Sequence, residues 1–219
     1  RRMDRPICFF SDYGYTDDFA GVCRAVIARL APDVRVIDVT HGLPERDVLA
    51  GAVVLRNTLP YMPDKAVILA VVDPGVGGPR RPVAMRSHGD RLFVGPDNGL
   101  LMHAVALDGG VSSAYELSNQ ELWLSPLSAT FHGRDIFSPV AAELARGTAP
   151  GELGEAVGFR ELASLELPEP MVTPTQVDAH VLYLDQYGNA ILNLHSEVLD
   201  GTFFTEDVAV WLETSRQKL

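Results

Sequence analysis

The first half of the chain alternates short apolar runs with segments of helical periodicity. Residues 17–30 carry apolar side chains at steps of three and four, which predicts an amphipathic helix with Thr16 near its N-cap. The same pattern predicts helices over residues 47–59 and 135–146, the second ending at Gly147. The intervening apolar runs predict strands over residues 6–10, 34–39, 66–72 and 91–95. Apolar strands that alternate with helices are typical of a parallel sheet, so we predict an α/β domain with a mainly parallel sheet flanked by helices.

The pattern changes after residue 159, where periodicity fades. Residues 160–176 hold three prolines, which predicts a linker. Beyond it, short β-type runs predict antiparallel hairpins; the runs are residues 177–184, 190–194 and 208–212, with turns at 187–189 and 200–201. We therefore predict an N-terminal α/β domain over residues 1–159 and a small antiparallel C-terminal β domain over residues 177–219. So short a segment builds a weak core by itself, so we expect this domain to be incomplete or to pack on a partner.

Composition narrows the class of protein. Apolar residues make up 47% of the 219 residues, which supports a real core. The net charge of −11 argues against a nucleic-acid partner and suits a small cationic substrate. No apolar run approaches the roughly 20 residues that cross a bilayer, and no signal segment opens the chain, so we expect a cytoplasmic protein that binds no membrane. Cys8 and Cys23 lie in a predicted strand and helix and are expected to be buried thiols.

Polar residues that could bind a ligand or take part in catalysis follow the predicted strands. The first strand leads into a loop with Asp12 and Asp17, and the strand over residues 66–72 delivers Asp73 into a glycine-rich loop that ends at Arg80. Aspartates before a helix are commonly caps, and a lone histidine such as His132 is commonly structural. Together, however, Asp73, Arg80 and His132 form a set of base, cation and partner that can orient and deprotonate a water molecule.

Other chemistries find no support in the sequence. The chain has no phosphate-binding P-loop, no zinc-binding His-Glu-x-x-His helix and no Gly-x-Ser-x-Gly nucleophile elbow. An acidic cluster of Asp12, Asp17 and Asp18 could attract a divalent metal, but His41, the nearest histidine, is not at ligand spacing. We therefore predict neither a metal nor a cofactor.

Five segments, in order along the chain, resemble the S-adenosylmethionine hydroxide adenosyltransferases, relatives of the fluorinase and chlorinase enzymes. These segments are residues 11–17, 40–44, 72–77, 95–99 and 130–137, and the resemblance extends over residues 6–195. It implies an N-terminal α/β domain and a C-terminal β-barrel-like domain. It also implies a homotrimer with each active site between neighbouring subunits.

The resemblance further implies hydrolysis of S-adenosyl-L-methionine (SAM), with no cofactor. Water activated by Asp73, Arg80 and His132 would attack the ribose C5′ and release adenosine and L-methionine. The halogenases carry tyrosines at the positions that match Asp73 and His132, and a halide-contacting serine where this chain has Gly133. The expected nucleophile is therefore water, with a chlorinase-like halogenase as the nearest alternative.

Substrate-binding roles follow from the same resemblance. Asp12 is expected to bind the ribose hydroxyls, and the methionine ammonium is expected to face Asp17 and Asp185. The nucleoside would meet the remaining three predicted residues: Phe131 and Tyr187 by packing, and Asn189 at the adenine edge. Taken alone, residues 187–189 are more typical of an ordinary hairpin turn than of a binding site. Members of the family continue past residue 219 into a segment that contacts the methionine carboxylate, so a noncatalytic SAM- or adenosine-binding module is a further alternative.

Overall fold

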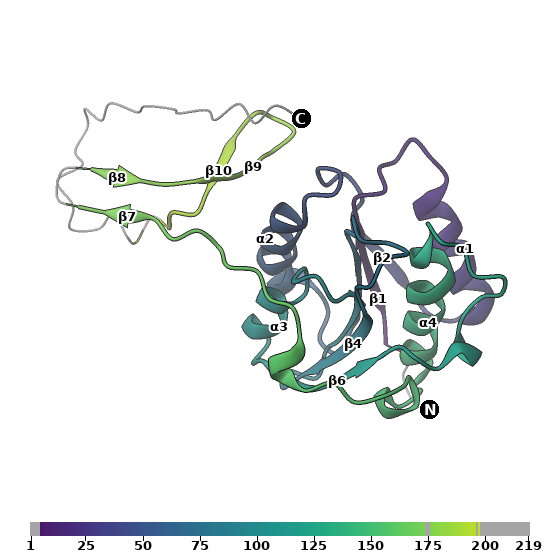
Figure 1. Ribbon diagram of the computed structural model, residues 1–219. Helices are drawn as coiled ribbons and strands as arrows, with labels where there is room; N and C mark the ends of the chain where they lie inside the picture. Colours follow the sequence, from purple (N-terminus) through teal and green to yellow (C-terminus); the bar gives the residue numbers. More distant parts are fainter. Residues whose placement is uncertain (1–4, 174–175, 196, 198–219) are drawn as a thin grey trace. The chain divides into compact units, whose positions relative to one another are not determined.

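The computed structural model describes residues 5–173, 176–195 and 197 (Figure 1). The chain divides into two compact units, Arg1–Glu166 and Leu167–Leu219. The predicted strand over residues 208–212 and the turn at 200–201 lie outside the described residues. The range 160–176, predicted as a linker, is shared between the two units and contains a short strand, described below.

The first unit is built on a six-stranded sheet with the strand order β2-β1-β3-β5-β4-β6 (Figure 1). β2, β1, β3 and β5 are parallel, and β4 runs antiparallel to both β5 and β6. The strand bounds are β1 Ile7–Ser11, β2 Val36–Thr40, β3 Val67–Val71, β4 Pro82–Ser87, β5 Leu92–Pro96 and β6 Val111–Glu116. The predicted α/β class is confirmed, with an antiparallel edge that the sequence pattern did not reveal.

Helices cover both faces of this sheet (Figure 1). α1 packs beside α4 on one face, and α2 packs beside α3 on the other. Their bounds are α1 Phe19–Leu30, α2 Val48–Thr58, α3 Met102–Leu107 and α4 Ser138–Arg146. Short 3₁₀ turns occupy Leu59–Tyr61, Gln120–Leu122, Pro150–Glu152 and Phe159–Glu161, and a π-helical turn, Gly133–Phe137, leads into α4.

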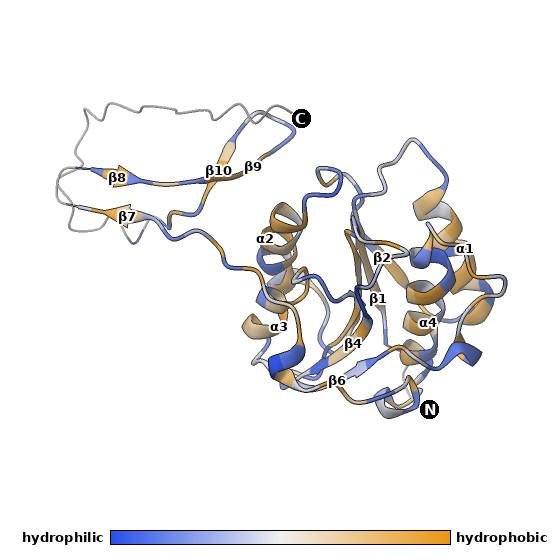
Figure 2. Ribbon diagram, viewed as in Figure 1, coloured by the Kyte–Doolittle hydropathy of each residue, from blue (hydrophilic) through white to orange (hydrophobic). Residues whose placement is uncertain are grey.

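The sheet is apolar on both faces, so it separates two cores (Figure 2). Successive side chains of a strand point to opposite faces. In β1, Ile7 and Phe9 join the core beneath α1 and α4, whereas Cys8 and Phe10 join the core beneath α2 and α3. Each of these side chains is fully buried. Burial of a side chain such as Phe9 is worth about 1.5–3 kcal/mol, which explains why the parallel strands read as uninterrupted apolar runs.

The helix ends bear out one prediction and correct two others. As predicted, Gly147 ends α4 in the left-handed region, at φ 101°. Asp47, predicted only as the first residue of a helix, caps α2 and accepts a hydrogen bond from the Ala50 amide at 2.9 Å. The cap of α1 was predicted near Thr16, but the N-cap residue is Asp18, which makes no side-chain capping bond. The helix predicted over residues 135–146 is α-helical only from Ser138 onward, because the π-helical turn precedes it.

Among its described residues the second unit contains two antiparallel strand pairs, of which the β9–β10 hairpin was predicted and the β7–β8 pair was not. β7, Met171–Val172, pairs with β8, Val177–Asp178. β9, Val181–Leu184, pairs with β10, Ala190–Leu192, across a hairpin turn. Among the described residues, no helix of either unit is long and apolar enough to cross a membrane.

Candidate active site

The loop after β3 folds back on itself to join Asp73 to Arg80. Arg80 donates from Nε to both carboxylate oxygens of Asp73, at 2.9 and 3.0 Å, and also from Nη2 to Oδ2. Two glycines make this loop possible: a Cβ at Gly75 would lie 3.3 Å from Cγ of Arg80, and a Cβ at Gly77 would lie 2.2 Å from the Ala129 carbonyl oxygen. The ion pair is largely buried, with the side chains of Asp73 and Arg80 only 6% and 10% exposed.

His132 approaches the same guanidinium from a distant segment. Nη2 of Arg80 lies 2.8 Å from Nδ1 of His132. A guanidinium has no acceptor, so Nδ1 must be the acceptor, and a neutral His132 ring carries its hydrogen on Nε2. The Arg80 guanidinium also lies over the ring of Phe137, with Cζ 5.3 Å from the ring centroid. The structure therefore brings together the three residues proposed from the sequence for water activation.

The environment of His132 favours its neutral form. Burial lowers the pKa of His132 below its ordinary value of 6.5, and the positive charge of Arg80 lowers it further. Asp73 and Asp135 act in the opposite direction with smaller effect. The ring is therefore uncharged at neutral pH.

The segment that carries His132 is held by a buried carboxylate. Asp135 is 1% exposed and accepts hydrogen bonds from the Ser128 amide at 2.8 Å and from Nε of Arg134 at 2.6 Å. Ser138 donates from its hydroxyl to the Gly133 carbonyl at 2.7 Å. These bonds fix the turn on both sides of His132, so the imidazole is preorganised against Arg80.

Asp12 lies on the loop that leaves β1, and a strained residue supplies its donor. Oδ2 of Asp12 accepts a hydrogen bond from the Arg46 amide at 2.8 Å, and Arg46 has the left-handed backbone angle φ 60°. Burial raises the pKa of Asp12, and the negative charges of Glu45 and Asp73 add to that rise, whereas the Arg46 bond opposes it. Because the charge of Asp73 contributes to the raised pKa of Asp12, the two carboxylates are close enough to repel each other.

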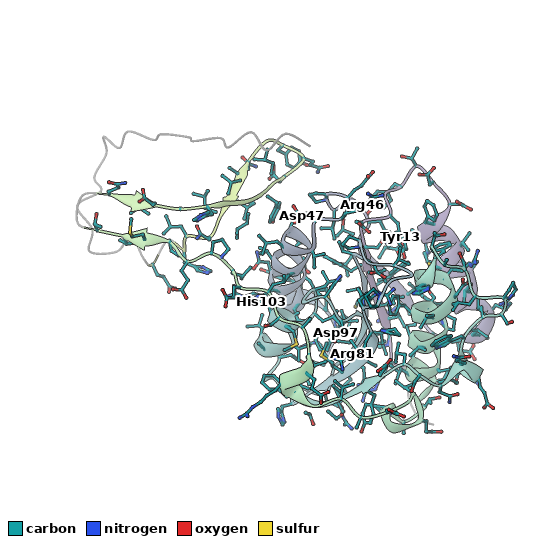
Figure 3. All side chains as sticks on the ribbon, in the orientation of Figure 1. Tyr13, Arg46, Asp47, Arg81, Asp97 and His103 are labelled. Atoms are coloured by element: carbon teal, nitrogen blue, oxygen red, sulfur yellow. The ribbon has the colours of Figure 1, made fainter. Side chains whose placement is uncertain are left out.

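Tyr13, on the same loop as Asp12, belongs to an aromatic group that also contains Phe131. Tyr13 and Arg46 are labelled in Figure 3. The Phe131 ring makes edge contacts with Tyr13 at 5.8 Å and with Phe19 at 5.1 Å between centroids. Phe131 also lies 5.0 Å from Cζ of Arg134. Asp17 is exposed on the loop before α1. Among the described residues, no three His, Cys, Asp or Glu side chains are grouped as metal ligands.

The other three predicted binding residues, Asp185, Tyr187 and Asn189, lie in the second unit. Asp185 accepts hydrogen bonds from the amides of Tyr187 and Asn189 at 2.9 and 2.8 Å, and from the Asn189 side-chain amide at 2.7 Å. The Asn189 side chain is the main reason that the pKa of Asp185 is lowered. Tyr187 is 82% exposed. These contacts form the hairpin turn between β9 and β10, so the alternative interpretation as a turn describes the observed structure, and the binding roles stay predictions.

A buried chain of hydrogen bonds through Ser11, His41 and Asp38, next to the Asp12 loop, was not predicted from the sequence. Oγ of Ser11 lies 2.7 Å from Nδ1 of His41, and Nε2 of His41 lies 3.2 Å from Oδ1 of Asp38. The order of groups matches that of a serine hydrolase, but Ser11 is fully buried and His41 is 2% exposed. These hydrogen bonds therefore join β1 to β2 and support the loop that follows Ser11.

Side chains in the segment over residues 95–99 form hydrogen bonds that hold neighbouring segments in place. Arg81 donates to Oδ2 of Asp97 at 3.1 and 2.9 Å, while Oδ1 of Asp97 accepts from the Ala163 amide at 2.8 Å (Figure 3). Asn98 donates from Nδ2 to the Val72 carbonyl at 2.9 Å. These contacts fix the chain immediately before Asp73, since Val72 is its neighbour.

Comparison with known proteins decides the family. Residues 7–154 match the profile described as the SAM hydroxide adenosyltransferase N-terminal domain. The chain belongs to the SAM hydroxide adenosyltransferase family. A family relative from Salinispora tropica, named (R)-S-adenosyl-L-methionine hydrolase, is 50% identical over 196 residues, which cover 89% of this chain and 74% of the relative. A fluorinase from an Actinoplanes species is 27% identical over 218 residues, covering 89% of this chain and 73% of the fluorinase.

The family fold is also found in a solved structure. An uncharacterized conserved protein from Thermotoga maritima superposes with a TM-score of 0.80 and 36% sequence identity. The superposition covers 88% of this chain and 73% of that protein. The resemblance inferred from the five sequence segments is thereby confirmed at the level of family and fold.

Proposed function

We propose that this chain hydrolyses S-adenosyl-L-methionine to adenosine and L-methionine. The oxygen of a water molecule forms a bond to the ribose C5′ while the C5′–S bond breaks, and the bonding pair moves to sulfur to leave a neutral thioether. One water proton passes to a base on the enzyme. The contact of Arg80 with both Asp73 and His132 carries this proposal, and it is supported by the 50% identical relative whose name states this activity.

The geometry favours distinct roles for the three residues. Nδ1 of His132 is occupied by Arg80, so Nε2–H is a donor that can orient the oxygen of the nucleophile. Asp73 keeps lone pairs beyond those that accept from Arg80 and is the group we assign to take the water proton. Arg80 holds both partners in place and stabilises the hydroxide that emerges. From the sequence, either Asp73 or His132 could take the proton, whereas the hydrogen-bond pattern favours Asp73.

The electrostatics suit a cationic substrate. Hydroxide and sulfonium attract each other, and the attraction strengthens where burial excludes water. A positioned base contributes about 10²–10⁴-fold to such a reaction, and preorganised charges and alignment contribute the remainder. The burial of Asp73 and Arg80 is consistent with this requirement.

We further propose the substrate contacts expected from the family resemblance. Asp12 binds the ribose hydroxyls, and its fixed carboxylate beside Arg46 supports this role. The remaining contacts are assigned to the methionine ammonium for Asp17 and Asp185, to the nucleoside for Phe131 and Tyr187, and to the adenine edge for Asn189. The reaction needs no cofactor, because the sulfonium is already a good leaving group.

A homotrimer with active sites between subunits and a location in the cytoplasm complete the proposal. The family resemblance supports the trimer. Sedimentation equilibrium of the purified protein checks the trimer, and a monomer at micromolar concentration would contradict it.

The reaction is tested by incubation with S-adenosyl-L-methionine in ¹⁸O-water, followed by mass spectrometry of the adenosine. We expect label in the 5′-hydroxyl, and faster turnover of the R epimer at sulfur, the epimer in the relative's name. Chloride-dependent 5′-chloro-5′-deoxyadenosine would indicate a halogenase instead. Calorimetric binding without any product would indicate a noncatalytic binding module.

A further inference from the structure

The Tyr13 side chain is fixed by aromatic neighbours from three different segments. Its ring centroid lies 6.4 Å from that of Phe9 in β1, 5.9 Å from that of Phe19 in α1, and 5.8 Å from that of Phe131. The contacts with Phe9 and Phe131 are edge-on, at 79° and 81°. Because the ring is held on several sides, its hydroxyl has a defined position.

That position lies against Gly133, the residue after His132. A Cβ added to Gly133 would lie 1.8 Å from the hydroxyl oxygen of Tyr13 and 2.9 Å from its Cζ. Gly133 does not have a positive φ, so the backbone does not require glycine here. Glycine is required because the Tyr13 hydroxyl occupies the space of a side chain.

The contact lies where the position of His132 is determined. His132 is the N-cap residue of the π-helical turn Gly133–Phe137, and Gly133 is the first residue of that turn. A shift of Gly133 moves the peptide that joins it to His132, and therefore moves Nδ1 relative to Arg80. The 2.8 Å hydrogen bond tolerates a displacement of only a few tenths of an ångström.

The Tyr13 hydroxyl also lies within the electrostatic range of the reactive set. Burial raises its pKa well above 10, the charges of Asp12 and Asp73 raise it further, and Arg80 lowers it. The group is therefore a neutral O–H at any physiological pH. It makes no hydrogen bond to another described residue, so packing against Gly133 is the contact that the structure assigns to it.

We propose that Tyr13 is a positioning residue for His132: its hydroxyl packs against Gly133 and thereby holds the imidazole on Arg80. This inference deepens the proposed hydrolysis and rests on it for its effect on turnover. It accounts for a tyrosine at position 13 and a glycine at position 133 as one matched pair.

A double-mutant cycle tests the pair. Gly133→Ala introduces the clash, and we expect kcat to fall at least 100-fold with KM changed less than threefold. In Tyr13→Phe/Gly133→Ala the oxygen at 1.8 Å is gone, and the remaining contact with Cζ at 2.9 Å needs a shift of only a few tenths of an ångström, so kcat should recover at least tenfold relative to Gly133→Ala. Tyr13→Phe alone leaves a gap beside Gly133 and should lower kcat about threefold to tenfold. Gly21→Ala is the matched glycine control, since no atom lies within 4 Å of its added Cβ, and Tyr13→Phe should not alter its effect.

A second readout does not depend on turnover. The pKa of His132, followed by NMR of labelled imidazole, should rise toward 6.5 in Gly133→Ala because Arg80 no longer faces Nδ1, and should fall again in the double variant. Thermal unfolding shows that each variant is folded. Equal impairment of Gly133→Ala and the double variant in both readouts would overturn the pairing. If the wild-type protein hydrolyses no SAM, the proposed function fails, while the NMR cycle still decides whether Tyr13 positions His132.

Discussion

Nη2 of Arg80 donates a hydrogen bond to Nδ1 of His132 at 2.8 Å while the same guanidinium holds Asp73. One planar group thereby fixes a carboxylate, an imidazole tautomer and the distance between them. Lysine cannot reproduce this arrangement, because an ammonium is a point donor without the rigid fork of a guanidinium.

Arg80→Lys is therefore expected to lower kcat/KM about 100-fold, within the range observed when one preorganised donor is lost. Steady-state kinetics with SAM measure the effect. Arg81→Lys is the matched control, since Arg81 forms a comparable pair with Asp97. A kcat/KM for Arg80→Lys within threefold of wild type would show that the fork is unnecessary.

Asp73→Asn should abolish proton acceptance while preserving shape. The amide cannot take the water proton, so kcat is expected to fall about 10²–10⁴-fold. Isothermal titration should show that SAM binding changes far less. The same substitution at Asp97 removes an ion pair away from His132, so it should lower the melting temperature with kcat within a few-fold of wild type. Turnover of Asp73→Asn near the wild-type rate would assign the base elsewhere.

Activity should fall as pH falls below 6.5. His132 must be neutral to accept from Arg80, and its pKa is lowered below 6.5 by burial and by Arg80. The acid limb of kcat against pH is therefore expected to have its midpoint below 6.5. In His132→Asn, which does not titrate, this limb should disappear from the residual activity. An acid limb at the same pH in that variant would assign the titration to another group.

The same lowered pKa makes stability depend on pH. In the unfolded chain His132 binds a proton near pH 6.5, whereas in the folded chain it does so only at lower pH. The contribution of His132 to stability is thus fully present above pH 6.5 and is lost as pH falls through the folded-state pKa. Urea unfolding of wild type and His132→Asn across this range should show a smaller pH dependence in the variant. Identical pH dependence in both would argue against the lowered pKa.

The left-handed Arg46 should tolerate glycine and reject proline. Arg46→Gly keeps the amide that donates to Asp12 and relieves a strain of about 1–2 kcal/mol, partly offset by the backbone entropy of glycine. Its melting temperature should match or exceed that of wild type. Arg46→Pro removes the amide hydrogen and forbids φ 60°, so KM for SAM should rise at least tenfold if Asp12 binds the ribose. An unchanged KM in a folded Arg46→Pro variant would separate Asp12 from substrate binding.

Several of the strands that were predicted correctly are buried on both faces. β1 and β3 are buried at every position, so their sequences are continuous apolar runs. β6 lies at the edge of the sheet and includes Ser112, Ser113 and Glu116, so its pattern resembles a loop. β4 begins at a proline, and α3 has only six residues, too few to show a helical period. Edge position for β6, an initial proline for β4 and brevity for α3 concealed these elements.

The site was predictable only in part for a related reason. Asp73 and Arg80 share one loop, and the position of Asp73 at the carboxyl end of a strand indicated a ligand site. His132 is far away in sequence, and its grouping with Arg80 rested on residue chemistry and on a family resemblance, not on spacing. The contact of Ser11 with His41 depends on the pairing of β1 with β2, and the contact of Tyr13 with Gly133 depends on side-chain packing. Neither has a signature in residue spacing.

The edges of the six-stranded sheet restrict how copies of this chain can associate. Beyond β6, the segment over residues 155–157 is already bonded to the strand: the Glu116 amide donates to Glu155 O at 2.8 Å, and the Val157 amide donates to Ala114 O at 2.9 Å. At the other edge, β2 carries Asp38 at its centre, paired with Arg24 at 3.1 Å. A charged edge strand is a poor template for strand addition. The trimer proposed above is therefore expected to assemble through side-chain surfaces of the first unit and not through continuation of its six-stranded sheet, and the same edges protect this sheet against fibril-like stacking.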